Sequence, residues 1–259
     1  MRDSLNIAIV QAQIAWQEPE ENRLHLQSLM AGIDHTVDLV VLPETFTTGF
    51  LGESPRIAED MQGPTLAWMK AQAEKLQANI TGSVAIFEDG VFRNRLLWVQ
   101  PGGLVEYYDK RHLFAKAGET DRYEAGEQRC TWDWNGWRIC PQICYDLRFP
   151  VWSRNRNDYD ILVYVANWPA PRLDAWSTLL KARAMENQCY VIGVNRVGED
   201  GNGKNYPGAS VIHDPLGRPV VEAGDGETVA YGQIQAEKLY SIREEYPFQV
   251  EADQFELSS

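Results

Sequence analysis

Short apolar runs recur along this chain, and between them lie segments in which apolar positions follow a helical period. The runs are rich in β-branched and aromatic residues and are short enough to be strands rather than helices. They predict strands at residues 5–14, 38–44, 79–87, 95–101 and 160–168.

The intervening segments carry start signals for helices. The segments at residues 19–34 and 64–78 each begin with a proline, which is favoured in the first helical turn. The segment at 174–188 begins with Asp174, which we expect to cap the amino-terminal end of a helix. These three segments are therefore predicted to be helices that alternate with the strands.

Two hairpins are marked by their turn residues. Asn135-Gly136 separates two aromatic-rich arms at residues 131–140, and Asp214-Pro215-Leu216-Gly217 separates the arms of 210–223. Strand and helix patterns alternate to the end of the chain without a linker, a low-complexity tract or a strict repeat. This organisation predicts an α/β fold in which residues 1–259 form a single domain.

Two of the predicted strands resemble each other. "DLVVLPE" (38–44) and "DILVYVAN" (160–167) are both apolar runs that end in a polar residue. In α/β folds the carboxyl ends of buried strands are where ligands bind and chemistry occurs. We therefore expect the functional residues near the ends of these two strands.

Composition limits the possible partners. The chain has 259 residues, of which 44% are hydrophobic, so it can bury a large core. Its formal net charge of -13 and pI near 4.8 argue against binding to nucleic acid or to an anionic membrane. The sequence has no apolar stretch long enough to span a membrane and no cleavable signal at its start. We expect a cytoplasmic protein that acts on a small molecule.

The cysteines do not indicate disulfides or zinc. Their spacing is irregular, and no C-x-x-C pair is present. Cys144 differs from the others because it ends the strand-like "WRICPQIC" just before a turn into a helix-like segment. This elbow would expose a nucleophile, and nearby helix amides would favour its thiolate. Cys140 and Cys189 are expected to be buried hydrophobic residues instead.

A nucleophilic cysteine needs a proton acceptor. His25, His35 and His213 lie in segments that are predicted to be at the surface, so a cysteine–histidine site would have to use His112. A carboxylate is the alternative: Glu44 ends an apolar strand, where a charge is costly unless it has a partner or a function. Lys110 follows another strand-like run, and read alone it would be an ordinary solvated lysine.

Taken together, these motifs resemble a known family. "LPE" at Glu44, "YDKRHLF" at Lys110 and "CYDLRFP" at Cys144 are similar to the Glu-Lys-Cys signature of the nitrilase superfamily of carbon-nitrogen hydrolases. The resemblance extends to "NWP" (167–169), "ARAMENQCYV" (182–191), "NRVG" (195–198) and "GASVIHDPLG" (208–217), and so covers almost the whole chain. It implies a four-layer α-β-β-α sandwich and a homodimer.

The resemblance also implies roles for single residues. Cys144 would be the nucleophile, Glu44 the general base and Lys110 the cation that stabilises the oxyanion. The family has a second glutamate after the lysine, which here is Glu119, with Glu124 as the competing assignment. An anion near Lys110 is also expected on physical grounds, because the lysine must stay charged in a partly buried site. No metal and no organic cofactor has a role in this chemistry.

Within the superfamily the chain is most similar to omega-amidases, which hydrolyse the terminal amide of 2-oxoglutaramate and 2-oxosuccinamate. Such substrates carry a distant carboxylate, and Arg148 is the expected receptor because a guanidinium matches carboxylate geometry. The structural alternative is an ion pair of Arg148 with Asp146 or with an acidic residue at a subunit interface. Tyr145 and Trp168 are further expected substrate contacts, and Phe50 stands where some omega-amidases have a tyrosine.

Three other functions stay open at this point. A nitrilase or an N-carbamoyl-amine hydrolase would use the same three residues on a nitrile or a ureido group. A thiol protein that binds without catalysis would be expected to lack one of Glu44, Lys110 or Cys144, and all are present.

Overall fold

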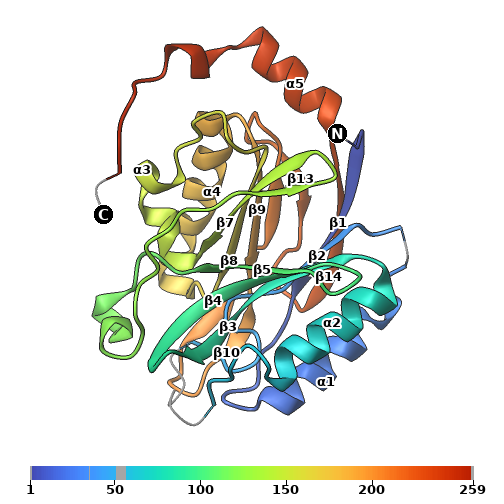
Figure 1. Ribbon diagram of the computed structural model, residues 1–259, viewed down its shortest axis with the longest axis vertical. Coiled ribbons are helices and arrows are strands. Elements are labelled where there is room, and N and C mark those ends of the chain that lie inside the picture. The colour runs from blue at the N-terminus through green and yellow to red at the C-terminus, as the bar shows by residue number, and fades with distance from the viewer. Residues whose placement is uncertain (1, 35, 51–56, 258–259) are drawn as a thin grey trace.

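A computed structural model describes residues 2–34, 36–50 and 57–257. These residues build two mixed sheets that pack face to face, with helices on both outer faces (Figure 1). The first sheet has the spatial order β14 (Thr228–Gln235), β1 (Ser4–Gln11), β2 (Leu39–Val41), β3 (Asn79–Glu88), β4 (Val91–Val99) and β5 (Val105–Asp109). The second has the order β13 (Pro219–Glu222), β12 (Val211–His213), β9 (Tyr190–Asn195), β8 (Ile161–Ala166), β7 (Trp137–Ile143) and β6 (Trp132–Trp134).

The two sheets share one plan. In the first sheet β1, β2 and β3 are parallel, and in the second β7, β8 and β9 are parallel. Antiparallel strands flank each parallel group on both sides. The two similar sequence runs become β2 and β8, the middle strand of each parallel group. Their carboxyl ends therefore occupy equivalent places in the two sheets.

Alternation along β1 shows how the layers are held together. Leu5, Ile7 and Ile9 pack into the core between the two sheets, whereas Ala8 and Val10 face the core under the first pair of helices. This period of two is what a strand with both faces covered requires. The two cores together hold the sheets and helices in four layers, as the family resemblance implied.

The helices cover the outer faces of the sheets. α1 (Pro19–Leu29) and α2 (Pro64–Leu76) lie side by side on the first sheet, while α3 (Pro150–Ser153) and α4 (Leu173–Asn187) lie on the second (Figure 1). α5 (Ala236–Glu245) leads into a C-terminal segment that runs along one end of the molecule. A small antiparallel ribbon, β10 (Val197–Glu199) with β11 (Asn205–Pro207), stands apart from both sheets. No helix in the described ranges has the length and apolarity needed to cross a bilayer.

Most predicted elements are present, with differences at their ends. α1 stops at Leu29 and is followed by a short 3₁₀ turn, and β4 begins at Val91, before the predicted start. The residue that caps α4 is Arg172, so Asp174 lies inside the first turn rather than at the cap. There its negative charge still interacts favourably with the positive end of the helix dipole. Both predicted hairpins form, and Asn135 and Gly136 have the positive φ angles of a tight turn.

Candidate active site

Glu44 follows β2 and is fully buried. Its Oε1 accepts hydrogen bonds from Asn94 Nδ2 at 2.9 Å and from Lys110 Nζ at 2.9 Å. Its Oε2 accepts one from the backbone N–H of Asn167 at 2.7 Å. Asn167 follows β8, so the ends of the two similar strands meet at this carboxylate. A buried carboxylate needs such partners to offset the loss of its hydration.

Lys110 follows β5, and its side chain is 1% exposed. Its Nζ lies 2.8 Å and 3.0 Å from the two oxygens of Glu119, in addition to its contact with Glu44. Burial disfavours the ammonium, but the nearby charges of Glu119 and Glu44 outweigh it and raise the pKa of Lys110 well above its ordinary value. The lysine therefore stays charged, and the interpretation as a solvated surface lysine is excluded.

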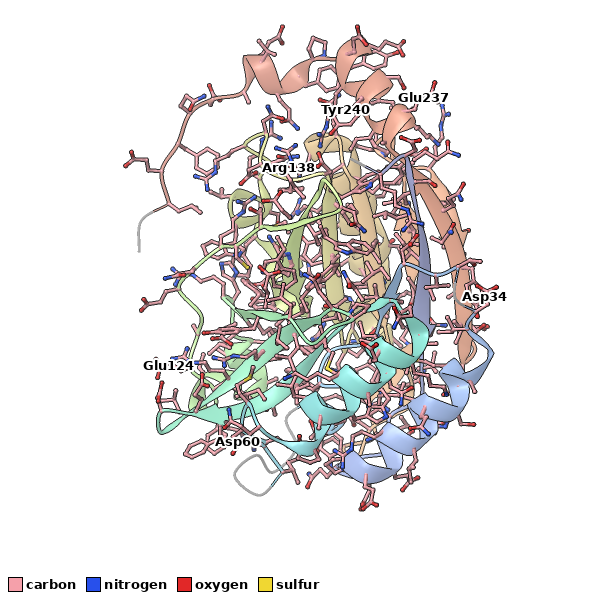
Figure 2. The ribbon with its side chains drawn as sticks, turned by 45° about the vertical axis from the view of Figure 1, so that its right-hand side comes forward. Asp34, Asp60, Glu124, Arg138, Glu237 and Tyr240 are labelled. Carbon is pink, nitrogen blue, oxygen red and sulfur yellow. The ribbon has the colours of Figure 1, made fainter. Side chains whose placement is uncertain are left out.

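The two candidate glutamates lie in different environments. Glu119 is fully buried, and its Oε2 also accepts the backbone N–H of Phe114 at 2.6 Å. Burial raises the pKa of Glu119, while Lys110 opposes that rise. Glu124 is exposed at the edge of the molecule, where it pairs with Arg93 (Figure 2). The structure thus places Glu119, and not Glu124, beside the lysine.

Cys144 lies at the predicted elbow, directly after β7 and at the start of the 3₁₀ turn η5 (Cys144–Arg148). Its φ angle is 43°, in the left-handed region that a side chain with a Cβ rarely adopts. Its Sγ lies 4.0 Å from the carbonyl oxygen of Asn167. The strand and the turn together direct the thiol toward the ends of β2 and β8.

The thiol differs from the prediction in its acidity. Burial raises the pKa of Cys144 well above its ordinary value, and the charge of Glu44 and a side-chain hydrogen bond with it act in the same direction. Lys110 opposes this rise. The expectation that helix amides favour the thiolate is wrong, because loss of hydration dominates at this depth. The resting group is a neutral thiol, which needs a base before it can attack.

The histidines occupy other places. His112 Nδ1 lies 2.8 Å from Asp146 Oδ1, and the ring stacks on Phe149 with centroids 3.6 Å apart. His213 is buried at the end of β12, so its predicted place at the surface is wrong: β12 is a strand of the second sheet, paired with β9 on one side and β13 on the other. His25 pairs with Glu227 at the surface, and His35 lies outside the described residues. Glu44 is therefore the proton acceptor that the thiol faces.

Sequence comparison decides the family. Residues 6–244 match the family model described as carbon-nitrogen hydrolase. The chain belongs to the carbon-nitrogen hydrolases. This match and the solved structures below confirm the family and the sandwich fold that the sequence motifs predicted.

Relatives of this carbon-nitrogen hydrolase extend over its full length. It is 45% identical to omega-amidase YafV of Escherichia coli K12 over 98% of both chains, and 32% identical to 2-oxoglutaramate amidase of Bacillus subtilis over 93% of this chain and 95% of that one. The crystal structure of XC1258 from Xanthomonas campestris, described as a CN-hydrolase superfamily protein with an arsenic adduct in its active site, superposes with a TM-score of 0.97 at 48% identity, with both chains fully covered. Saccharomyces cerevisiae Nit3, of the nitrilase superfamily, shares the fold with a TM-score of 0.86 at 23% identity, over 95% of each chain.

Cys144 and Lys110 open into a cavity of about 970 Å³. Six of the described lining residues are aromatic. Among them is Phe50, whose ring centre lies 5.3 Å from Lys110 Nζ and which offers no hydroxyl to a substrate. Four further cations line the cavity: Lys116, Arg148, Arg172 and Lys204. Among the described lining residues there is no aspartate or glutamate. Glu44 and Glu119 lie behind Lys110, and do not belong to the wall.

The predicted substrate contacts all line this cavity. The Arg148 guanidinium lies 5.1 Å from the centre of the Trp168 ring, and Tyr145 packs against Phe114. The alternative ion pair between Arg148 and Asp146 does not form. Within the described parts of the chain, Asp146 instead accepts hydrogen bonds from other donors, and Arg148 has no ion pair.

Several site residues were not singled out from the sequence. Asn94 and Asn167 hold Glu44, yet only the "NWP" motif hinted at one of them. Arg172 approaches the cavity from the start of α4, and its guanidinium lies 4.8 Å from the centre of the Phe114 ring. No local pattern marks such residues, because segments that are far apart in the sequence bring them to the site only in the folded chain. In the described ranges, no group of three or more His, Cys, Asp or Glu side chains is arranged to hold a metal ion.

Proposed function

We propose that this carbon-nitrogen hydrolase is an omega-amidase, which releases ammonia from the terminal amide of a 2-oxo dicarboxylate monoamide such as 2-oxoglutaramate or 2-oxosuccinamate. The observation that carries the proposal is the cavity wall: apart from Lys110, it presents four cations that have no ion pair within the described residues. The names of the relatives, omega-amidase YafV and 2-oxoglutaramate amidase, support the same substrate class.

The negative net charge of the chain strengthens the argument that these cations bind an anionic substrate. At a net charge of -13 the protein repels anions at long range, and acidic residues outnumber basic ones by 37 to 24. Several arginines elsewhere in the chain, such as Arg95 and Arg129, pair with a carboxylate. Cations that instead gather around one cavity without such partners favour an anionic ligand, because they act within the screening length of about 8 Å at physiological ionic strength. The reacting thiol lies in the same cavity.

The first half of the reaction forms a thioester. Glu44 accepts the proton of the Cys144 thiol, and the sulfur attacks the amide carbon. The carbonyl oxygen becomes an oxyanion, which Lys110 and the backbone N–H of Tyr145 stabilise. Glu44 then donates the proton to the amide nitrogen, the carbon–nitrogen bond breaks, and ammonia leaves.

The second half releases the acid. Glu44 takes a proton from water, and the resulting hydroxide attacks the thioester carbon. Lys110 again stabilises the oxyanion. When this intermediate collapses, the carbon–sulfur bond breaks and the proton on Glu44 returns to the Cys144 sulfur. The product is a dicarboxylate, and the enzyme is back in its resting state.

Glu119 has a supporting role in this scheme. It contacts the Lys110 ammonium at 2.8 Å, in addition to the 2.9 Å contact with Glu44, and so helps to fix the direction of its N–H bonds. Without Glu119, the lysine would have one carboxylate partner and could turn away from the developing oxyanion. Fixed donors are effective in catalysis because they need no reorganisation when charge develops.

Arg148 and Arg172 are the proposed receptors of the distant carboxylate. Each guanidinium rests on an aromatic ring, Trp168 and Phe114 respectively, and neither is neutralised by an acid in the described structure. An aromatic face orients a guanidinium without cancelling its charge. Arg148→Met should therefore lower kcat/KM for an anionic amide by roughly 10- to 100-fold, which corresponds to about 1.5 to 3 kcal/mol for one charged hydrogen bond.

The test compares rates of ammonia release. Wild-type enzyme and Arg148→Met are assayed with 2-oxoglutaramate, 2-oxosuccinamate and butanamide, which has no carboxylate. Arg156→Met is the matched control, because Arg156 is also exposed and lies 6.0 Å from the Phe255 ring but is not part of the cavity wall. We expect selective loss on the two anionic amides in Arg148→Met alone. An equal loss on butanamide would indicate that Arg148 has a structural role.

The same ammonia-release assay also tests the two other activities that would use these catalytic residues. Butyronitrile tests a nitrilase, and N-carbamoyl-β-alanine tests a carbamoyl-amine hydrolase. A higher kcat/KM on either compound than on both omega-amides would overturn the proposed substrate class. No turnover of any of these compounds would point to a thiol protein that binds without catalysis.

We further propose a homodimer that forms through the face built by α3, α4 and the C-terminal segment. Val151, Met185, Phe248 and Val250 are exposed there, and Val250 is 84% exposed. Hydrogen bonds tie both α3 and the C-terminal segment to the end of α4, so these residues belong to one face. Light scattering after gel filtration should give twice the chain mass of 29.4 kDa. Val250→Glu with Phe248→Glu should give the monomer, and a monomeric wild type would refute the proposal.

A further inference from the structure

Asp146 lies two residues after Cys144 and is fully buried in the described structure. Its Oδ2 accepts hydrogen bonds from the backbone N–H of Ile143 at 2.9 Å and from the Tyr108 hydroxyl at 2.8 Å. Its Oδ1 accepts the backbone N–H of His112 at 2.9 Å and faces His112 Nδ1 at 2.8 Å. A buried carboxylate with this many donors is held in one position.

The donors come from the two segments that carry the proposed catalytic groups. Tyr108 and His112 stand two residues before and two residues after Lys110. Ile143 stands one residue before Cys144, and Asp146 itself stands two residues after it. One carboxylate therefore connects the end of β5, in the first sheet, with the elbow after β7, in the second sheet.

The donors are themselves fixed. The Tyr108 hydroxyl also accepts a hydrogen bond from Trp152 Nε1 at 3.1 Å. The His112 ring is stacked on Phe149 and meets Trp152 edge-on. The contacts of Asp146, which form a joint between the sheets, are consequently fixed on the side of each sheet.

The elbow needs such support because of its backbone conformation. Cys144 has φ of 43°, and residues with a Cβ keep such an angle only where the surroundings enforce it. The bond from Ile143 N–H to Asp146 closes the turn around Cys144. Loss of this bond would let the elbow relax and move the sulfur.

We propose that Asp146 is a positioning residue that sets the distance between the Cys144 sulfur and the Lys110 ammonium. The inference rests on the proposed roles of Cys144 and Lys110 in the reaction. Asp146 is not part of the cavity wall and acts only through the two segments it joins. Its effect should therefore appear in kcat, and much less in KM.

Asp160 provides a matched control. It is also fully buried, and its carboxylate accepts hydrogen bonds from Arg138 and Arg243 at distances between 2.7 Å and 3.1 Å. It directly precedes β8, whereas the site lies at the other end of that strand. Asp160→Asn should lower stability without moving Cys144 relative to Lys110.

The experiment measures two rates in Asp146→Asn and Asp160→Asn. The first is kcat for ammonia release from an omega-amide, and we expect a roughly 100-fold loss in Asp146→Asn, since a displacement of about 1 Å can have this effect. KM should stay within about threefold. The second is alkylation of Cys144 by iodoacetamide, followed by peptide mass. We expect it to slow because the thiolate that forms when Glu44 accepts the thiol proton loses its alignment with Lys110. Asp160→Asn should retain both rates.

The two rates separate the inference from the proposed function. Alkylation needs no omega-amide, so it tests Asp146 even if the wild-type enzyme releases no ammonia. If Asp146→Asn alkylates as fast as the wild type, or if its kcat falls no more than that of Asp160→Asn, the inference is overturned. A wild-type enzyme without amidase activity would overturn the proposed function alone.

Tyr108→Phe is a milder variant that tests the same inference if Asp146→Asn does not fold. It removes one donor to Asp146 and leaves the ring in place. We expect kcat to fall several-fold in Tyr108→Phe, and no further loss when this change is added to Asp146→Asn, since both act through one joint. Independent, multiplicative losses would show that the joint does not act as a unit and would overturn the inference.

Discussion

Lys110→Met removes the one ammonium that lies between two buried carboxylates. The side chain keeps its approximate length, but Glu44 and Glu119 then face each other without a cation between them. Both carboxylates are fully buried and lie outside the cavity wall, so water replaces the lost partner poorly. The substitution should therefore reduce stability as well as activity.

The size of the stability loss follows from the distances. At 2.8 Å and 2.9 Å, each ion pair has a Coulomb energy of about 6 kcal/mol at an effective dielectric constant near 20. The cost of dehydrating three charges offsets much of this in the intact enzyme. Removing one partner of a buried pair nevertheless costs about 3 to 5 kcal/mol, because the other charge stays buried. That is a large part of the roughly 5 to 15 kcal/mol by which a domain is stable.

The loss should depend on pH in a defined direction. Burial already raises the pKa of Glu119, and Lys110 opposes the rise, so the pKa must rise further when Lys110 is removed. The folded variant then binds a proton more tightly than the unfolded chain, whose glutamates titrate near 4.3. Its stability should fall as pH rises above that value and through the raised pKa of the folded state. At pH 5.5 the deficit should be smaller than at pH 8.

Urea unfolding at pH 5.5 and pH 8 measures both effects. Lys75→Met is the control, because Lys75 is exposed in the last turn of α2 and its loss should change stability by less than about 0.5 kcal/mol. Ammonia release by Lys110→Met should fall by at least roughly 100-fold at either pH, since no cation remains for the oxyanion. A deficit below about 1 kcal/mol at pH 8, or one that grows on acidification, would refute the reasoning.

Two further predictions concern the other reacting groups. Cys144→Ala should abolish ammonia release and leave the circular dichroism spectrum unchanged, whereas Cys189→Ala, at a buried cysteine away from the cavity, should keep its activity; turnover by Cys144→Ala would exclude it as the nucleophile. Glu44→Gln should lower kcat by roughly 1,000-fold, because the amide cannot accept the thiol proton, and a loss below tenfold in steady-state ammonia release would indicate another base.

The strands and helices of the fold were predictable because they follow from local patterns, whereas their arrangement in four layers was implied by the resemblance to the nitrilase superfamily. Each apolar run became a strand, and the similar runs at 38–44 and 160–167 became the middle strands of two equivalent sheets. The turn at Asn135-Gly136 was predictable for the same reason, since few residues tolerate positive φ angles. In these cases the physical cause lies within a few residues of its effect.

The details of the site were less predictable because their causes lie far apart in the chain. Glu119 and Glu124 are alike in sequence, and only the folded chain buries one and exposes the other. The acidity of Cys144 was predicted in the wrong direction, since the depth of the thiol depends on both sheets. Arg172 reaches the cavity from the start of α4, which no motif indicates.

The contacts of Glu44 explain why fold and chemistry are coupled in this protein. Asn94 comes from β4, Lys110 follows β5, and Asn167 follows β8 in the opposite sheet. The geometry around one carboxylate therefore depends on how the two sheets pack across their common core. Protein interiors are close-packed and transmit small shifts. A substitution that leaves a packing defect in that core can therefore misalign the catalytic groups while the four layers persist. Activity should thus be more sensitive than secondary structure to changes between the sheets.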